Sequence, residues 1–164
     1  AIGCYNKAIR VKDLLRIWIF SYLGNLIGSV IFATVYVNTG LASGSTSAML
    51  LSLAEQKMSL PFMELFFRAI LCNVLVCLGV WCYIKLKDES AKLIMVFWCI
   101  FAFVTMGFEH SIANMTLFSA ALLVPHGAAV TLGGAVYNIL VATLGNIIGG
   151  AVIIGGAYYY MYRE

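Results

Sequence analysis

An apolar region between residues 93 and 124 is interrupted by Gly107-Phe108-Glu109-His110-Ser111-Ile112-Ala113-Asn114-Met115. The part before the hinge, Leu93 to Phe108, is apolar over 16 residues. As a helix it would be roughly 24 Å long, which is shorter than the ~30 Å hydrocarbon layer of a bilayer. A second apolar piece runs from Met115 to Val124. Two short apolar pieces around a polar, ionisable hinge predict a broken helix that lines a pathway through a membrane.

The composition of the whole chain also indicates a membrane protein. Of its 164 residues 63% are hydrophobic and 10% are charged, and the mean hydropathy is +0.98. Soluble domains are about 45–50% apolar and about 25% charged, so we expect neither a soluble enzyme nor a disordered linker. The net charge is +3 without a dense Lys/Arg cluster, so no nucleic-acid partner is expected. Strands of period 2 are absent, and we predict an all-α membrane protein that is not an enzyme.

The apolar runs divide the chain into four predicted spans within one transmembrane domain, 1–164. The first is uncharged from Ile17 to Val37. The spans are placed at 14–37, 62–84, 93–124 (broken near 107–114) and 137–162. Between them we expect a turn-rich loop at 38–47, a short interfacial helix from Ala48 to Lys57, and a water-exposed charged loop from Lys85 to Lys92.

The positive charges predict the orientation of these spans. They lie before the first span, after the second and after the last, at Lys7, Arg10, Lys12, Arg16, Lys85, Lys87, Lys92 and Arg163. The loops at 38–47 and 125–136 contain no Lys or Arg. Because positive loops stay in the cytoplasm, both ends of this segment should be cytoplasmic in a multi-pass inner (plasma) membrane protein.

A short internal repeat suggests a larger architecture. Leu23-Gly24-Asn25-Leu26-Ile27-Gly28 matches Leu144-Gly145-Asn146-Ile147-Ile148-Gly149 at an offset of 121 residues, in spans of opposite direction. Such an inverted repeat is typical of transporters, although a chance match of so short a motif is the alternative. Two spans precede the later copy and none precedes the earlier one, so we expect a six-span parent that lacks its first two spans here. The small residues at i, i+4 should let helices approach closely.

Ionisable residues inside membrane segments are functional candidates, because their desolvation is costly. Lys57 precedes a span on the outer side, where a snorkelling lysine is the alternative. Glu64 and Arg68 are spaced i, i+4 and are expected simply to pair on one helix face. His110 stands at the break beside Glu109, and a structural histidine is the alternative.

Other residues give weaker indications of chemistry. His126, in the outer loop, is expected to be solvated. The cysteine content is odd, at five, and no CxxC pair occurs. We therefore expect neither a disulfide framework nor a zinc site, and no other metal.

Three motifs resemble those of the formate/nitrite transporter family. Residues 107–115 resemble its GFEHSIANM signature, residues 68–81 its fourth helix, and residues 143–150 its sixth. The resemblance covers essentially the whole chain. It implies an aquaporin-like helical bundle with an inverted repeat and broken helices, five protomers that each have a pore, and a chain that corresponds to the third to sixth helices. The broken second span, which bears a threonine near the histidine in relatives, would be missing.

The resemblance also implies roles for individual residues. His110 would lie at the centre of the pore and Lys57 in its outer vestibule, with Asn73 and Glu109 in a polar network around the lysine. Phe103 would contribute to an outer constriction, unless it is an ordinary lipid-facing or core phenylalanine. Asn114 completes the substrate-pathway candidates as part of the polar hinge. The segment between Asn114 and Thr143 looks closer to the nitrite and hydrosulfide branches than to formate channels.

The function implied is passage of small monovalent anions: nitrite, hydrosulfide or formate. Lys57 would attract the anion, and the anion would take a proton near His110 and cross as the neutral acid. In the competing version His110 stays neutral and only donates a hydrogen bond to the passing anion. Alternatives are a neutral-solute channel, a haem-bearing electron carrier and a structural subunit. Asn-Pro-Ala boxes are absent, and the two histidines flank one short segment, so no haem or other cofactor is expected.

Overall fold

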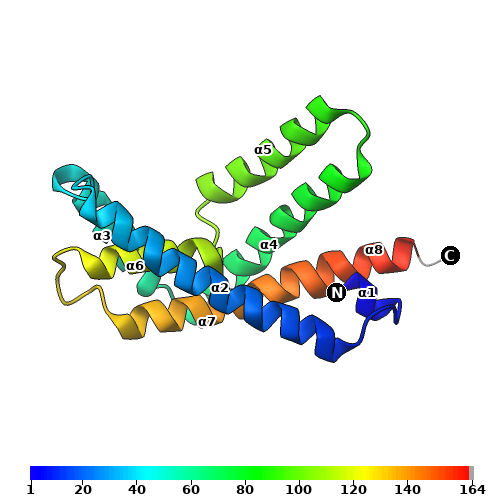
Figure 1. Cartoon of the computed structure of the whole chain (residues 1–164), viewed down its shortest axis with the longest axis horizontal. Helices are drawn as coiled ribbons and strands as arrows, with labels where there is room; N and C mark the ends of the chain where they lie inside the picture. The colour runs from blue at the N-terminus through cyan, green and yellow to red at the C-terminus, as the bar shows by residue number, and fades with distance from the viewer. Residues whose placement is uncertain (163–164) are drawn as a thin grey trace.

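The computed structural model describes residues 1–162, and every regular element among them is helical (Figure 1). Arg163, which contributed to the charge tally, lies outside the described residues. The elements are α1 (Ile2–Tyr5), α2 (Val11–Asn38), α3 (Gly44–Met58), α4 (Phe62–Lys85), α5 (Glu89–Thr105), α6 (Ser111–Leu123), α7 (Leu132–Ile147), the π-helix η1 (Ile148–Ile154) and α8 (Gly155–Met161).

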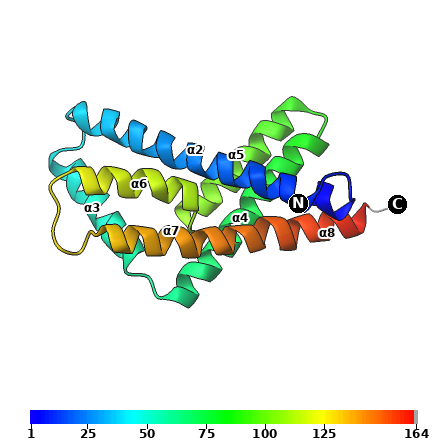
Figure 2. The same ribbon diagram turned by 60° about the horizontal axis from the view of Figure 1, so that its bottom comes forward.

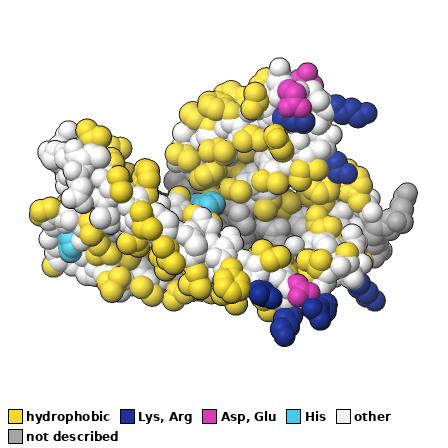
Figure 3. Space-filling view, in the orientation of Figure 1, with side chains coloured by type: hydrophobic (Ala, Val, Ile, Leu, Met, Phe, Trp, Pro, Cys, Tyr) yellow, Lys and Arg dark blue, Asp and Glu magenta, His cyan; other side chains and the backbone are white. Residues whose placement is uncertain are grey.

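Three of these helical stretches are long and apolar enough to cross a membrane: α2, α4 and the continuous run from Leu132 to Met161. Their outer surfaces are apolar, as shown by Phe20 and Phe32, which are 66% and 63% exposed. On the face shown in the space-filling view, Lys and Arg gather toward one end, and apolar side chains are spread over the rest (Figure 3). This distribution suits a lipid environment around the apolar part, so the expected all-α membrane class is confirmed.

The polar hinge is a break between α5 and α6, but it is shorter than the predicted 107–114. The connecting residues are 106–110, and Gly107 takes a left-handed backbone, φ +66, that favours glycine. Helix α6 already starts at Ser111, because the Nδ1 atom of His110 accepts the backbone N–H of Ala113 at 3.2 Å. The imidazole is therefore the N-cap of the second half-helix.

Two other boundaries differ from the predictions because caps extend the helices. Helix α5 begins at Glu89, inside the predicted loop, because the Asp88 carboxylate accepts the N–H of Ala91 at 2.7 Å. Helix α7 begins at Leu132 and not at 137, because the Thr131 hydroxyl accepts the N–H of Gly134 at 3.0 Å.

The last span contains a wide turn that hydropathy did not reveal. Residues Ile148–Ile154 form a π-helix between α7 and α8. Next to and within it, side chains from other elements bond to the helix carbonyls. The Asn73 amide donates to the carbonyl of Asn146, and the Tyr5 hydroxyl donates to the carbonyl of Ala151 at 3.0 Å. Such turns are frequent at functional sites.

Helix α7 and η1 approach α4 closely through glycines, as the second copy of the repeat predicts. A Cβ at Gly145 would lie 2.6 Å from the Ala69 Cβ, and one at Gly149 would collide with the backbone oxygen of Ile70. The first copy differs: Gly24 and Gly28 have no atom within 4 Å that a Cβ would meet. The close approach expected there is therefore not made among residues 1–162.

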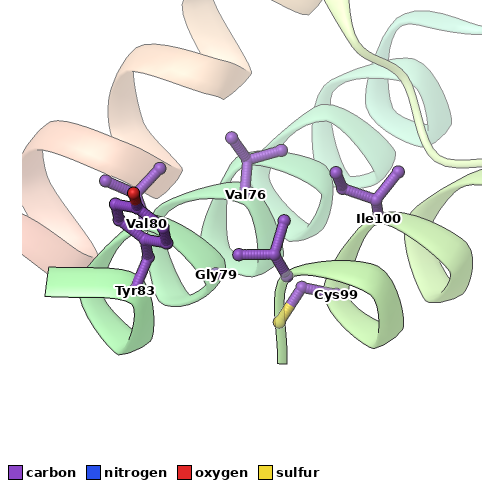
Figure 4. Close-up of a pocket in the computed structure, with 7 residues that line it drawn as sticks. Val76, Gly79, Val80, Tyr83, Cys99 and Ile100 are labelled. Carbon is purple, nitrogen blue, oxygen red and sulfur yellow. The ribbon is translucent and has the colours of Figure 1, made fainter. Parts of the chain in front are cut away.

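The bundle leaves one helical hairpin to the side. Helices α2 and α7 run in opposite directions, with α6 beside both and the α4–α5 hairpin extending away from α2 (Figures 1 and 2). The Thr116 hydroxyl donates to the Ser29 hydroxyl at 3.0 Å and joins α6 to α2. The hairpin carries an apolar groove of about 290 Å³, lined by Gly79, Cys99 and their neighbours (Figure 4).

The glycine contact makes a testable prediction about stability. Replacing Gly149 by Ala should lower the free energy of unfolding by about 2 kcal/mol, because the added methyl group forces η1 away from α4. Gly156→Ala is the control, since no atom lies within 4 Å of its Cβ position and alanine favours the helix. Denaturant titration in detergent micelles compares the two variants, and equal stability would contradict the assigned contact.

Candidate functional site

A buried ion pair lies beside the helix break. The Lys57 Nζ atom, from the last turn of α3, is 2.6 Å from Oε1 of Glu109, which lies in the break. The Glu109 side chain is 1% exposed and the Lys57 side chain is 21% exposed. The pair is therefore nearly neutral overall, and its positive end is the part that remains accessible.

Two amides complete the surroundings of the carboxylate. The Nδ2 atoms of Asn114 and Asn138 donate to Oε2 of Glu109 at 2.6 and 3.2 Å, and Asn114 also donates to Oδ1 of Asn138 at 2.8 Å. Asn138 donates further to the backbone oxygen of Lys57 at 2.8 Å. Both carboxylate oxygens of Glu109 therefore have hydrogen-bond partners, which a buried polar group requires.

The backbone of the break is held by Asn146. Its Nδ2 atom donates to the carbonyls of Ala69 and Glu109 at 2.8 and 2.9 Å, and its Oδ1 atom accepts the N–H of Ser111 at 3.0 Å. A break exposes backbone groups that have no intrahelical partner, and inside a membrane no water is available to satisfy them. One side chain of α7 thus fixes both α4 and the start of α6.

The structure separates Asn73 from the lysine network, in contrast to the expectation. Its amide donates to the backbone oxygen of Asn146, and within residues 1–162 it has no hydrogen bond to Lys57 or Glu109. It lies in the wall of a cavity of about 680 Å³, together with Ser111 and Asn146. This cavity extends along α2 toward Ala1 and Ala151, and neither Lys57 nor His110 lines it.

His110 is held by its cap and by an aromatic neighbour. Because Nδ1 accepts a backbone N–H, a neutral ring carries its proton on Nε2, which is then a free donor. The Phe103 ring of α5 is stacked on the imidazole, with centroids 5.8 Å apart and planes 25° apart. The structure therefore places Phe103 against the histidine itself.

The side chains of the remaining ionisable candidates do not join this network, although the backbone oxygen of Arg68 accepts the N–H of Glu109 at 3.5 Å. Arg68 and Glu64 form an exposed pair at 3.4 Å on one face of α4, as their spacing predicts. His126 is exposed, and its Nδ1 atom lies 3.2 Å from the carbonyl oxygen of Gly127.

Sequence reasoning missed Asn138 and Asn146 as site residues. For Asn146 a signal existed, because it is the polar residue of the LGN repeat inside an apolar span. For Asn138 the sequence offered only an amide near the start of a span.

Breaking the ion pair should lower the free energy of unfolding. A double variant should show that the loss comes from leaving one charge without its partner. Glu109→Gln leaves the Lys57 charge partly buried without its partner, and we expect a loss of about 3 kcal/mol in the free energy of unfolding. Lys57→Met combined with Glu109→Gln should recover most of that loss, because no lone charge remains. Asp13→Asn, in an exposed pair with Arg10, should change stability by less than about 1 kcal/mol. Additive losses in the double variant would contradict the pairing.

Comparison with known proteins identifies the family. The family model described as "Formate/nitrite transporter" matches residues 1–160. The uncharacterized transporter YwcJ of Bacillus subtilis is 48% identical over 155 residues, which cover 94% of this chain and 60% of that protein. The nitrite transporter NirC of Escherichia coli is 43% identical over 141 residues, which cover 85% of this chain and 52% of NirC. The chain thus spans about half to three fifths of the length of these relatives.

Solved structures agree with this assignment. A channel described as "FNT family ion channel" superposes with a TM-score of 0.91 at 38% identity, over 97% of this chain and 64% of the other. The structure "Pentameric formate channel with formate bound" gives 0.86 at 29% identity, over 95% and 69% of the two chains. The helical fold, the broken helix and the sequence motifs all lead to one conclusion: this chain belongs to the formate/nitrite transporter family, whose members are multi-pass membrane transporters and channels and not enzymes.

Proposed function

We propose that this chain forms part of a membrane pathway for small monovalent anions: nitrite, hydrosulfide or formate. The observation that carries the proposal is the buried Lys57–Glu109 pair at 2.6 Å, beside a helix break that ends at His110. The names of the relatives support the substrate class, since they include a nitrite transporter and a formate channel. No cofactor is part of the proposal.

Lys57 attracts the anion only at short range, because Lys57 and Glu109 together form a dipole with little net charge. A bare anion in an apolar constriction faces a large desolvation cost, which a fixed positive charge offsets. Because Glu109 balances the lysine, the long-range field is weak. The accessible ammonium group and the N-terminus of α6 nevertheless create a positive potential at short range. Asn114 contributes by holding Glu109 back from the passing anion.

His110 acts as a neutral hydrogen-bond donor through Nε2. A proton relay needs the doubly protonated ring, and that form would break the bond that Nδ1 accepts from Ala113. The cap therefore supports the hydrogen-bond version over the relay. As the anion loses water its conjugate acid becomes favoured, so the anion takes a proton from a water molecule at the mouth of the pathway, the hydroxide formed stays in the bulk solvent, and the imidazole keeps its own proton. Phe103, stacked on the ring, narrows the path beside it.

The proposal also covers the membrane topology of the chain and its oligomeric state. The chain would be one transmembrane domain that contains the spans Val11–Asn38, Phe62–Lys85 and Leu132–Met161 and the broken pair α5–α6. Its two ends would face the cytoplasm, at an inner (plasma) membrane. The clustering of Lys and Arg toward one end of the molecule supports this orientation (Figure 3). A homopentamer in the lipid bilayer is proposed by analogy with the pentameric formate channel. Asn73 would line the inner cavity of each protomer.

The charge of Lys57 should govern anion entry. The complete natural protein is reconstituted into liposomes. Uptake of formate, nitrite and hydrosulfide is then measured for each anion alone and in competition. Lys57→Met with Glu109→Gln removes the positive end without leaving a lone charge, and anion uptake should fall about tenfold, which corresponds to about 1.4 kcal/mol. Uptake of a small neutral solute should stay near the wild-type rate. An equal loss for both solutes would show that the lysine is structural.

Replacing His110 separates hydrogen bonding from proton transfer. Asparagine can still cap α6 but cannot titrate, so His110→Asn should slow anion uptake while its dependence on pH keeps the wild-type shape. Initial uptake rates between pH 5 and pH 8 measure this, since an ordinary histidine titrates in that range. A flattened profile in the variant would overturn the neutral-donor role and support the relay.

A further inference from the structure

Aromatic rings hold the ammonium group of Lys85 at one end of the bundle. The Lys85 Nζ atom, at the last residue of α4, lies 5.1 Å from the ring centroid of Trp81 and 4.5 Å from that of Tyr162. Trp81 is in turn stacked on Tyr158 of α8, with centroids 3.9 Å apart and planes 20° apart. Ring faces attract a cation, so these contacts order the lysine side chain. We call these four residues the Lys85 cluster.

The charge of Lys85 is not balanced by a carboxylate within residues 1–162, where Lys85 forms no ion pair. The two acids of the neighbouring loop and helix start are engaged elsewhere. Asp88 caps α5 by accepting the N–H of Ala91 at 2.7 Å. Glu89 lies 2.6 Å from the Nζ atom of Lys92. The rings attract the ammonium group but carry no net charge, so an anion from outside these residues can still neutralise it.

The cluster lies at the ends of two spans, where a bilayer changes from hydrocarbon to headgroups. Lys85 is the last residue of the span Phe62–Lys85, and Tyr162 directly follows the span Leu132–Met161. Trp and Tyr side chains favour this headgroup level. Lys85 is exposed and Tyr162 is 59% exposed, so a molecule in the surrounding leaflet can reach both.

We propose that the Lys85 cluster binds the headgroup phosphate of an anionic phospholipid in the leaflet at this end of the molecule. The ammonium group donates to a phosphate oxygen, while Trp81 and Tyr162 contact the glycerol and the first acyl carbons. A zwitterionic lipid fits less well, because its own cation balances its phosphate and because Lys85 already occupies the ring faces that could hold a choline. The inference does not depend on which anion passes through the protein.

Lys87 is a matched control for this site. It is an exposed cation two residues further along, and within residues 1–162 it has neither an ion pair nor a ring contact. A diffuse surface potential would attract anionic lipid through both lysines equally. A built site favours Lys85, because its side chain is already ordered and loses less conformational entropy when the lipid binds.

The test measures the melting midpoint of the complete natural protein in a neutral detergent, without any transported anion. Dioleoylphosphatidylglycerol, dioleoylphosphatidylcholine or soluble glycerol phosphate is titrated into the wild type, Lys85→Gln and Lys87→Gln. We expect only phosphatidylglycerol to raise the wild-type midpoint. In Lys85→Gln the amount needed for half of that gain should rise about fivefold, which corresponds to about 1 kcal/mol for one lysine, and in Lys87→Gln it should change less than about twofold.

The design separates lipid binding from folding. Each gain is measured against the same variant without lipid, so a changed starting midpoint does not affect the comparison. Tyr162→Leu keeps the charge and removes the nearer ring, and it should also need more phosphatidylglycerol than Lys87→Gln does. Because Tyr162 is exposed at the end of α8, this variant tests the site even if Lys85→Gln fails to fold.

Four results would overturn the proposal. Equal shifts in Lys85→Gln and Lys87→Gln would indicate a diffuse surface potential, and an unchanged lipid dependence in Lys85→Gln would show that Lys85 does not contact the lipid. An equal gain with glycerol phosphate would indicate a site for a free phosphate. A wild-type midpoint that phosphatidylglycerol leaves unchanged would show that no such lipid binds.

Discussion

The fold depends on giving hydrogen-bond partners to the backbone N–H and C=O groups where a membrane helix is interrupted. Between α5 and α6 the chain leaves its helical hydrogen bonds, and a bilayer supplies no water to replace them. Asn146 takes up two of these groups, the carbonyl of Glu109 and the N–H of Ser111, and ties them to α4 through Ala69. The Nδ1 atom of His110 accepts a hydrogen bond from a third group, the backbone N–H of Ala113. The break is therefore a rigid part of the fold, and the site is built on it.

The same arrangement balances charge in the apolar interior. Glu109 would be costly to bury alone, and Lys57 and two amides surround it. The ammonium group donates to Oε1 of Glu109 and keeps an accessible edge. In the function proposed above, such a nearly neutral pair would lower the barrier for a passing anion without trapping it.

Close helix packing and the site are connected through one helix. Gly145 and Gly149 let α7 approach α4, and this approach brings Asn146 to the break. The π-helix that follows widens the turn there, where Asn73 bonds to the carbonyl of Asn146. A methyl group on either glycine would thus act on the site as well as on stability.

The sequence by itself determined the membrane class, the helical segments, the hinge around Glu109 and His110 and the family, because hydropathy and local motifs are properties of neighbouring residues. It also predicted the Glu64–Arg68 pair, which depends only on helical spacing. Only the tertiary structure decided that Asn138 and Asn146, which lie 29 and 37 residues from Glu109, complete the site, and that Asn73 does not reach the lysine. Helix caps likewise moved the starts of α5 and α7. The physical reason is that partners across helices are chosen by how the helices pack, and the apolar residues that direct this packing look alike along every span.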